Sequence, residues 1–325
     1  MVLWQALLFA VGLLVLTLGA DLFIRGASGL GRRLGLKPYV IGLVIVGVGT
    51  SAPELAVNLS AAFASHYDLA LGNVVGSNIA NIGLILGLSA LLAPIAIHMR
   101  LLRVEAPLML AACVLLWLLA LDGRLARIEG LLLVAGQIGV LLLVFRAGKH
   151  ESAEVRQELS AVSEEAPGHW PSTLGLLVLG LCGLVGGGVL AVDAASAIAR
   201  GFGISELIIG LTVVAIGTSL PELASSVVAA LRGHSDIAIG NVIGSNLFNI
   251  LFILGSTASL HPLPVAASLE KIELPVMIGF AACLLLMMGR RMRISRGEGA
   301  LLLAAYLGLI AWQVINALAN AGSAP

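Results

Sequence analysis

Two glutamates stand inside long apolar segments of this 325-residue chain, and the same short motif precedes each of them. Residues 49–54 are GTSAPE and residues 217–222 are GTSLPE, so the motif recurs 168 residues later. If residues 39–64 form one helix, Glu54 lies roughly 15 to 22 Å from its ends, at 1.5 Å per residue. A carboxylate at that depth in a membrane is energetically costly and is usually functional. The repetition favours a functional role for Glu54 and Glu222 over a structural hydrogen bond at a helix interface.

The residues around each glutamate supply further oxygen atoms. Pro53 has no N–H and its ring pushes against the carbonyl of Gly49, so we expect the helix to be interrupted there, with freed backbone carbonyls. Thr50 and Ser51 precede Glu54 by four and three residues, which places the three side chains on one helical face. The second copy repeats this arrangement with Thr218, Ser219 and Glu222. Such oxygen atoms suit Na⁺ or Ca²⁺, whereas softer metals favour sulfur or imidazole.

A second motif follows each glutamate segment. Residues 72–81 are GNVVGSNIAN and residues 240–249 are GNVIGSNLFN. The glycines spaced four apart allow close helix packing and need no other explanation. Packing does not explain polar side chains in hydrocarbon, however. Ser77 and Asn81 are four residues apart and share a helical face, as do Ser245 and Asn249. We therefore predict that these four side chains complete an ion site.

The combined oxygen atoms point to a site for a divalent cation. Six to eight oxygens suit Ca²⁺, and two carboxylates neutralise its charge. Without Ca²⁺ two carboxylates would be left together in a medium of low dielectric constant, so monovalent cations or protons must compensate them. This requirement gives a physical basis for ion exchange. The predicted ligands are Thr50, Ser51, Glu54, Ser77, Asn81, Thr218, Ser219, Glu222, Ser245 and Asn249.

Composition indicates an all-α membrane protein that crosses the bilayer many times. The chain is 59% hydrophobic and 11% charged, with a mean hydropathy of +1.06. Its formal net charge of zero gives no support to nucleic-acid binding. The three cysteines lie scattered in apolar runs, without the spacing of a disulfide framework or a zinc site. We expect no cofactor and no protein partner.

Ten segments are long and apolar enough to span a membrane. Five precede and five follow one hydrophilic interruption, so we predict repeats at residues 1–145 and 172–325, joined by a linker at residues 146–171. The second and seventh helices would be broken at the proline motifs. The predicted spans are 2–26, 38–64, 70–93, 104–122, 125–145, 172–199, 206–231, 238–260, 271–289 and 298–318.

The two halves are related in sequence. Residues 40–94 align with residues 208–262 without a gap, with about 30 identities. Because each half has an odd number of spans, the second copy must enter the membrane from the opposite side. We therefore predict inverted-topology repeats that bring Glu54 and Glu222 together. Such symmetry supplies the outward-open and inward-open states of an alternating carrier.

Basic residues predict the orientation in a cell (inner) membrane. With the N-terminus outside, cytoplasmic segments hold 14 of the 18 Lys and Arg residues, and outer segments hold Arg124, Arg127, Arg200 and Lys271. Both termini are then extracytoplasmic and the central loop is cytoplasmic. Asp21 and Arg25 are expected to form an i,i+4 pair on the first helix. Asp193 aligns with Arg25, so we expect a solvated residue near the outer boundary instead of a ligand.

The two motifs and the ten-helix duplication resemble the sodium/calcium exchanger family of the cation/calcium antiporter superfamily, especially its compact prokaryotic members. The resemblance implies Ca²⁺ movement against a Na⁺ gradient by alternating access. It also implies that Glu54 and Glu222 are shared Ca²⁺ and Na⁺ ligands, that Ser77 and Ser245 serve outer and inner Na⁺ sites, and that helices one and six slide as gates. Some relatives, including K⁺-dependent ones, have aspartate where this chain has Asn249, so no K⁺ requirement is inferred.

Three other functions stay open. A Ca²⁺/H⁺ or other cation/proton antiporter is the nearest alternative, because two adjacent glutamates can also bind protons. An intramembrane enzyme is disfavoured, since phosphoryl chemistry needs a basic group beside the carboxylates and every Lys and Arg maps to a loop or helix end. A passive cation channel is not excluded by the motifs. We therefore expect a transporter and not an enzyme.

Overall fold

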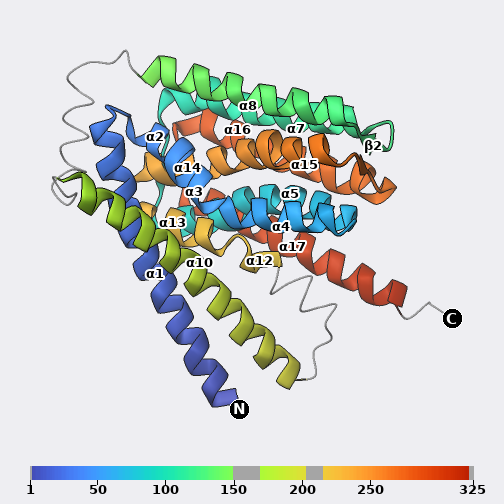
Figure 1. Cartoon of the computed structure of the whole chain (residues 1–325), viewed down its shortest axis with the longest axis horizontal. Coiled ribbons are helices and arrows are strands. Elements are labelled where there is room, and N and C mark those ends of the chain that lie inside the picture. The colour runs from blue at the N-terminus through green and yellow to red at the C-terminus, as the bar shows by residue number, and fades with distance from the viewer. Residues whose placement is uncertain (1, 149–168, 203–214, 322–325) are drawn as a thin grey trace.

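The computed structural model describes residues 2–148, 169–202 and 215–321, and nearly all of them lie in helices (Figure 1). Eight of the described helices are long and apolar enough to cross a membrane, and a bent pair at residues 38–63 makes a ninth candidate. The prediction of an all-α membrane protein is thus confirmed. The remaining predicted span, 206–231, lies partly outside the described residues and contributes the shorter apolar helix Leu220–Leu231.

Several spans of the first half consist of consecutive segments with α- and π-helical hydrogen bonding. Their bounds are α1 (Val2–Arg33), α2 (Pro38–Val40), η1 (Ile41–Val46), α3 (Gly47–Thr50), α4 (Ala52–Phe63), α5 (Tyr67–Ala80), η2 (Asn81–Leu86), α6 (Gly87–Leu92), η3 (Leu101–Glu105), α7 (Ala106–Ala120) and α8 (Arg127–Gly148).

The second half repeats this order. Its elements are α10 (Trp170–Gly201), α12 (Ala215–Gly217), α13 (Leu220–Leu231), α14 (Ser235–Leu247), η5 (Phe248–Leu254), α15 (Gly255–Leu260), η6 (Leu269–Glu273), α16 (Leu274–Arg291) and α17 (Arg296–Ala321). The bounds of α10 and α13 equal those of α1 and α4 shifted by 168 residues, which is the offset of the sequence repeat.

The first helix is longer than predicted. Hydropathy placed its end at residue 26, but α1 continues to Arg33. No helix-breaking residue intervenes, because the first strong stop is Gly35, whose φ of +67° favours glycine, followed by Pro38. Arg32 and Arg33 in the last turn also suit the negative end of the helix dipole. The predicted linker, residues 146–171, lies mostly outside the described residues.

Two short antiparallel strand pairs join the halves. β1 (Ile95–Ala96) pairs with β4 (Arg293–Ile294), and β2 (Arg124–Leu125) pairs with β3 (Leu263–Pro264). β1 and β3 are equivalent at the 168-residue offset, and β2 and β4 match within one residue. The two pairs are therefore counterparts of one another, each containing one strand from either half.

The helices α1 and α10 pack against each other along much of their length and form an arm beside the other helices (Figure 1). Glycines make this approach possible. A Cβ atom on Gly19 would lie 2.6 Å from the carbonyl carbon of Gly183. Any larger residue at Gly19 would force the two helices apart.

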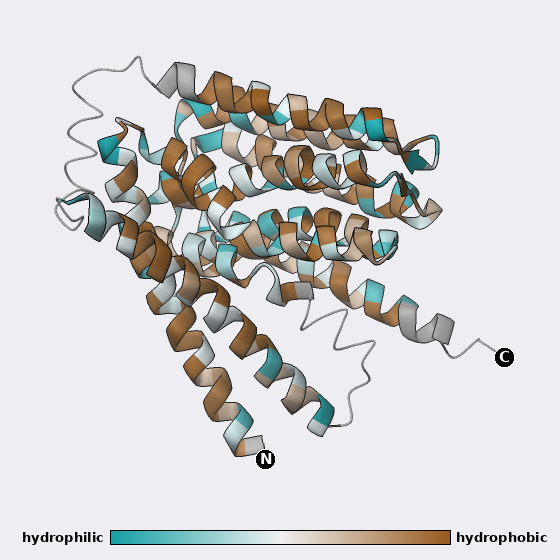
Figure 2. Cartoon of the chain, in the orientation of Figure 1, coloured by the Kyte–Doolittle hydropathy of each residue, from teal (hydrophilic) through white to brown (hydrophobic). Residues whose placement is uncertain are grey.

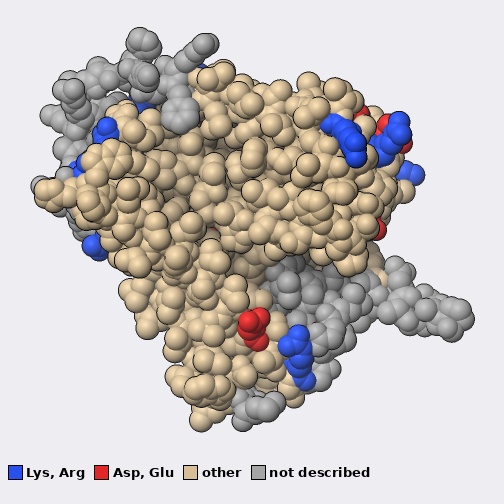
Figure 3. All heavy atoms as spheres, in the orientation of Figure 1, with Lys and Arg blue, Asp and Glu red and all other residues tan. Residues whose placement is uncertain are grey.

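The helices that follow the glutamate segments form the interior. In the segment from Ser235 to Leu260, 94% of the most apolar window is buried inside the protein, against 28% for Arg127–Val144. Hydrophobic residues cover the outer helices (Figure 2), and charged groups gather at the two ends of the helical body with an uncharged surface between them (Figure 3). This is the pattern of helices that face lipid around a protected centre.

Candidate ion-binding site

The first glutamate segment bends immediately before Glu54. α3 ends at Thr50 and α4 starts at Ala52, and the helical segment Pro38–Thr50 is bent by 42° relative to α4. Pro53 occupies the first turn of α4, where its missing N–H costs no helical hydrogen bond. The second copy is arranged in the same way: α12 ends at Gly217, and Pro221 lies in the first turn of α13. The hydroxyl groups before each proline lie next to the glutamate of the other motif, as Ser51 does to Glu222.

The two glutamates come together from opposite halves of the chain. Glu54 and Glu222 are each only 1% exposed. The Ser51 hydroxyl donates a hydrogen bond to Glu222 Oε1 at 3.0 Å, which links the first motif directly to the second glutamate. The two carboxyl groups also interact with each other electrostatically. If both are ionised, their repulsion in this buried position must be balanced by a positive charge.

Several oxygen atoms in this region are buried without a hydrogen-bond donor. Among the described residues, none donates to Glu54 Oε2, Glu222 Oε2, Asn81 Oδ1 or Asn249 Oδ1, and the Ser219 hydroxyl also has no hydrogen-bond partner. Buried polar atoms are nearly always satisfied, so buried acceptors without a donor call for an ion or a water molecule. These five residues all belong to the predicted ligand set, and they come from both halves.

The hydroxyl residues of the predicted set differ in their surroundings. The Thr50 hydroxyl donates to the Val46 carbonyl at 3.0 Å and lies 3.3 Å from Asn241 Oδ1. The Ser245 hydroxyl donates to the Gly47 carbonyl oxygen at 3.4 Å, so this hydrogen bond connects the two halves of the chain. Ser77 is buried on α5, and Thr218 is half-buried between α12 and α13.

Three asparagines that the sequence analysis did not select complete the polar centre. Asn241 is fully buried, and its amide donates to Ser226 Oγ at 2.8 Å. Asn246 accepts a hydrogen bond from Asn81 at 2.9 Å. Asn78 and Asn246 are equivalent in the two halves, and each points its amide at the sulfur of an equivalent methionine, Met277 and Met109 respectively. Asn241 precedes Ser245 by four residues, so the helical spacing that predicted Ser245 and Asn249 also indicated Asn241.

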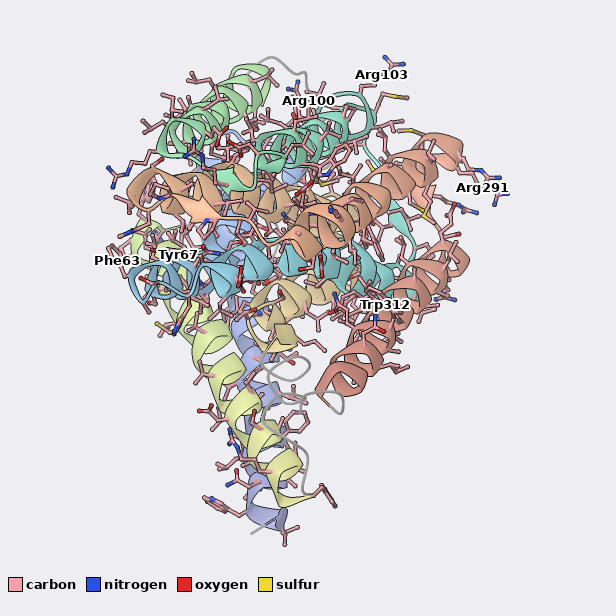
Figure 4. All side chains as sticks on the ribbon, turned by 90° about the vertical axis from the view of Figure 1, so that its right-hand side faces the viewer. Phe63, Tyr67, Arg100, Arg103, Arg291 and Trp312 are labelled. Carbon is pink, nitrogen blue, oxygen red and sulfur yellow. The ribbon has the colours of Figure 1, made fainter. Side chains whose placement is uncertain are left out.

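The arrangement suits a hard cation and gives little support to other chemistry. Within the described ranges no three His, Cys, Asp or Glu side chains form a cluster, and the oxygen atoms near the two carboxylates include the Ser51 hydroxyl. Arg103 and Arg291 extend outward at the periphery of the helical body (Figure 4), and both are exposed. Groups of that kind cannot assist phosphoryl transfer at the buried glutamates.

Comparison with known proteins decides the family. The model of the sodium/calcium exchanger protein family matches residues 4–146 and residues 172–315. The chain belongs to the sodium/calcium exchanger family. It is 36% identical over 338 residues to the sodium/calcium exchanger MaX1 of Methanosarcina acetivorans, covering 94% of this chain and 97% of MaX1. It is 40% identical over 315 residues to the inner membrane protein YrbG of Escherichia coli strain K12, covering 94% of each.

A solved structure extends this similarity to the fold. The sodium–calcium exchanger NCX_Mj, soaked with Na⁺ and Ca²⁺, superposes with a TM-score of 0.82 at 32% sequence identity, covering 96% of this chain and 99% of NCX_Mj. The family resemblance predicted from the two motifs is therefore confirmed. This exchanger-family chain is a multi-pass membrane protein from a family of cation/Ca²⁺ antiporters.

Proposed function

We propose that the protein exchanges Ca²⁺ for Na⁺ across the membrane by alternating access, with the ions held midplane between Glu54 and Glu222. The observation that carries the proposal is the meeting of these two buried carboxylates, each with an oxygen that no described donor satisfies. One Ca²⁺ neutralises both charges, and Na⁺ ions can replace it without leaving the carboxylates uncompensated.

The proposed ligands are the ten predicted residues. Glu54 and Glu222 supply the charge, and the hydroxyls and amides supply neutral oxygens from both halves. A hard cation prefers this mixture of carboxylate, hydroxyl and carbonyl ligands. The proposed set is Thr50, Ser51, Glu54, Ser77, Asn81, Thr218, Ser219, Glu222, Ser245 and Asn249. We add Asn241 and Asn246 as residues that orient these ligands through the hydrogen bonds described above.

We also propose that the chain has ten spans in two inverted repeats of five, residues 1–145 and 172–325, around a linker at 146–171. Three observations support this arrangement: the family model matches each half separately, the strand pairs are counterparts, and the Asn78–Met277 and Asn246–Met109 contacts exchange under the same offset. An inverted repeat makes the inward-open and outward-open states nearly equivalent in energy.

The proposed location is the cell (inner) membrane, with both termini extracytoplasmic and the central loop cytoplasmic. The E. coli relative YrbG is named as an inner membrane protein, which supports the compartment. The bias of Lys and Arg supports the orientation.

The test is Ca²⁺ uptake into proteoliposomes loaded with Na⁺, with the pH clamped equal on both sides. We expect uptake that requires the outward Na⁺ gradient and stops when a Na⁺ ionophore collapses it. Uptake driven only by a pH gradient would replace this proposal with Ca²⁺/H⁺ exchange. Unsaturable Ca²⁺ flux without counter-ion dependence would indicate a channel.

A further inference from the structure

A cavity of about 180 Å³ lies between α10 and the two proline breaks. From α10 it is lined by Gly188, Val189, Val192 and Asp193, which stand on one face at i, i+1, i+4 and i+5. Across the cavity it is lined by Pro53, Gly217, Thr218 and Pro221. The two prolines directly precede Glu54 and Glu222, so the cavity adjoins the candidate ion site.

Asp193 is the one charged residue among the described residues that line this cavity. It is exposed, and within residues 2–148, 169–202 and 215–321 it has no ion-pair partner. It stands eight residues before the end of α10 at Gly201, about 12 Å along the helix. The sequence analysis expected a solvated residue near the outer boundary, and the Asp193 side chain is exposed. Together with Thr218 it lines the cavity.

The equivalent position on α1 is built differently. At the 168-residue offset, Arg25 takes the place of Asp193, and it pairs with Asp21 at 3.0 Å. Phe23 takes the place of Ala191 and packs on Gly49, where a Cβ atom would lie 2.5 Å from the ring. Phe23 is only 3% exposed. Val192 packs on Gly217 in the same way in the second half. The difference between the halves is therefore the charge, because α10 has a carboxylate on the cavity wall where α1 has an ion-paired arginine.

We propose that Asp193 recruits divalent cations to the ion site, holding Ca²⁺ at the mouth of the cavity before it passes to Glu54 and Glu222. The inference rests on the proposed function and extends it to a residue outside the ligand set. An isolated carboxylate in a cavity with mostly apolar walls concentrates cations, because the walls focus its field. The attraction is twice as strong for a divalent as for a monovalent cation at the same position. Asp193 thus favours Ca²⁺ over Na⁺ at the predicted outer face.

The test is the initial rate of Ca²⁺ uptake into Na⁺-loaded, right-side-out vesicles as a function of external Ca²⁺. For Asp193→Asn we expect an apparent KM for external Ca²⁺ about two- to eightfold higher at low ionic strength, and less at high salt. The maximum rate should stay near that of the wild type. The external Na⁺ concentration that halves the uptake rate should rise by only about the square root of the factor by which the KM for Ca²⁺ rises. Asp193→Glu should restore the wild-type KM.

The matched control is Asp122→Asn, which removes the same charge from an exposed side chain in the turn between α7 and α8. It should leave the KM unchanged. An unchanged KM in Asp193→Asn, an equal effect of Asp122→Asn, or equal shifts for Ca²⁺ and Na⁺ would each overturn the inference. Failure of the proposed Na⁺ coupling can be told apart from failure of the Asp193 inference, because Ca²⁺ uptake by the wild type would then require a pH gradient. The same KM comparison under that gradient would still test Asp193.

Discussion

At the scale of single residues, the proposed exchange mechanism depends on two buried acids that repel each other until a cation binds. Ser51 donates to Glu222, but one oxygen of each glutamate has no donor among the described residues. This arrangement favours a ligand that brings positive charge, as we propose. A structural pair of glutamates would instead be expected to have fixed donors on both oxygens.

Replacing either glutamate by glutamine should weaken Ca²⁺ binding without destabilising the fold. For Glu54→Gln or Glu222→Gln we expect Ca²⁺ affinity to fall at least about a hundredfold, because loss of one buried partner costs about 3 kcal/mol or more. In EGTA each variant should melt at or above the wild-type Tm, since a buried charge repulsion is gone. Adding Ca²⁺ at 100 times its Kd should stabilise the wild type by about 2.7 kcal/mol and neither variant.

A thermal melt with and without Ca²⁺, followed by uptake in proteoliposomes, checks this prediction. Ser172→Ala is a suitable control, because Ser172 is exposed at the start of α10 and, among the described residues, its hydroxyl donates to the His169 carbonyl alone. Wild-type Ca²⁺ exchange by both glutamine variants would remove Glu54 and Glu222 from the site.

Asn249 offers the opposite change, the addition of a charge. Its Oδ1 atom is buried and lacks a donor among the described residues. Asn249→Asp keeps the shape of the side chain and adds a third carboxylate to the proposed ligand set. We expect folding to be preserved and the ion coupling to change, with Ca²⁺ uptake becoming dependent on K⁺ or on protons that neutralise the extra charge. Uptake measured against K⁺ and pH would test this, and an unaltered ion dependence would contradict it.

Much of the site was predictable from the sequence because the duplication repeats each costly residue. Glu54 and Glu222 stand out by burial and repetition together. Asn246 was not predicted, since the four-residue spacing that selects Asn81 leaves it on another helical face. Its role comes from packing between halves, where it accepts from Asn81, and no local pattern contains that contact.

At the scale of elements, the arm formed by α1 and α10 is joined to the rest of the protein by an ion pair. Asp21 on α1 pairs with Arg232 in the turn after α13, and also with Arg25 one turn along α1. Both Asp21 and Arg232 side chains are partly shielded, at 21% and 30% exposure. If α1 and α10 slide, this ion pair holds the arm in the position seen here.

Asp21→Asn should therefore shift the balance between the two states. A partly exposed ion pair contributes up to about 1 kcal/mol, so we expect the state seen here to lose up to about fivefold in relative population. Because apparent affinity scales with the fraction of the competent state, the KM values for Ca²⁺ on the two membrane faces should move in opposite directions. Measurements on right-side-out and inverted vesicles check this.

Arg25→Gln is the control for this prediction, since it removes the pair within α1 and leaves Arg232 beside Asp21. Equal KM changes on both faces in Asp21→Asn would show an effect on the ion site itself, and the role in state balance would be wrong.

At the scale of the whole molecule, hydropathy and self-comparison predicted the helices and their repetition. They did not predict where helices end or how they pack. α1 runs past the predicted residue 26 because nothing before Gly35 stops it, and charge alone does not end a helix. The sequence around Gly19 and Gly183 likewise does not predict that the two helices cross there, because many of the 39 glycines in the chain have no closely packed helix beside them.

Orientation is the prediction that concerns the entire chain, because inverted repeats with five spans each require the two termini on one face and the linker on the other. We expect a green fluorescent protein fused after Pro325 to stay dark in a bacterial inner membrane, because it does not mature when exported through the general secretory pathway. Alkaline phosphatase at the same position should be active. Insertion of either reporter at residue 160 should give the reverse. Reporters that agree at both positions would mean an even number of spans in the second half, and the inverted repeat, with its meeting of Glu54 and Glu222 from opposite leaflets, would be wrong.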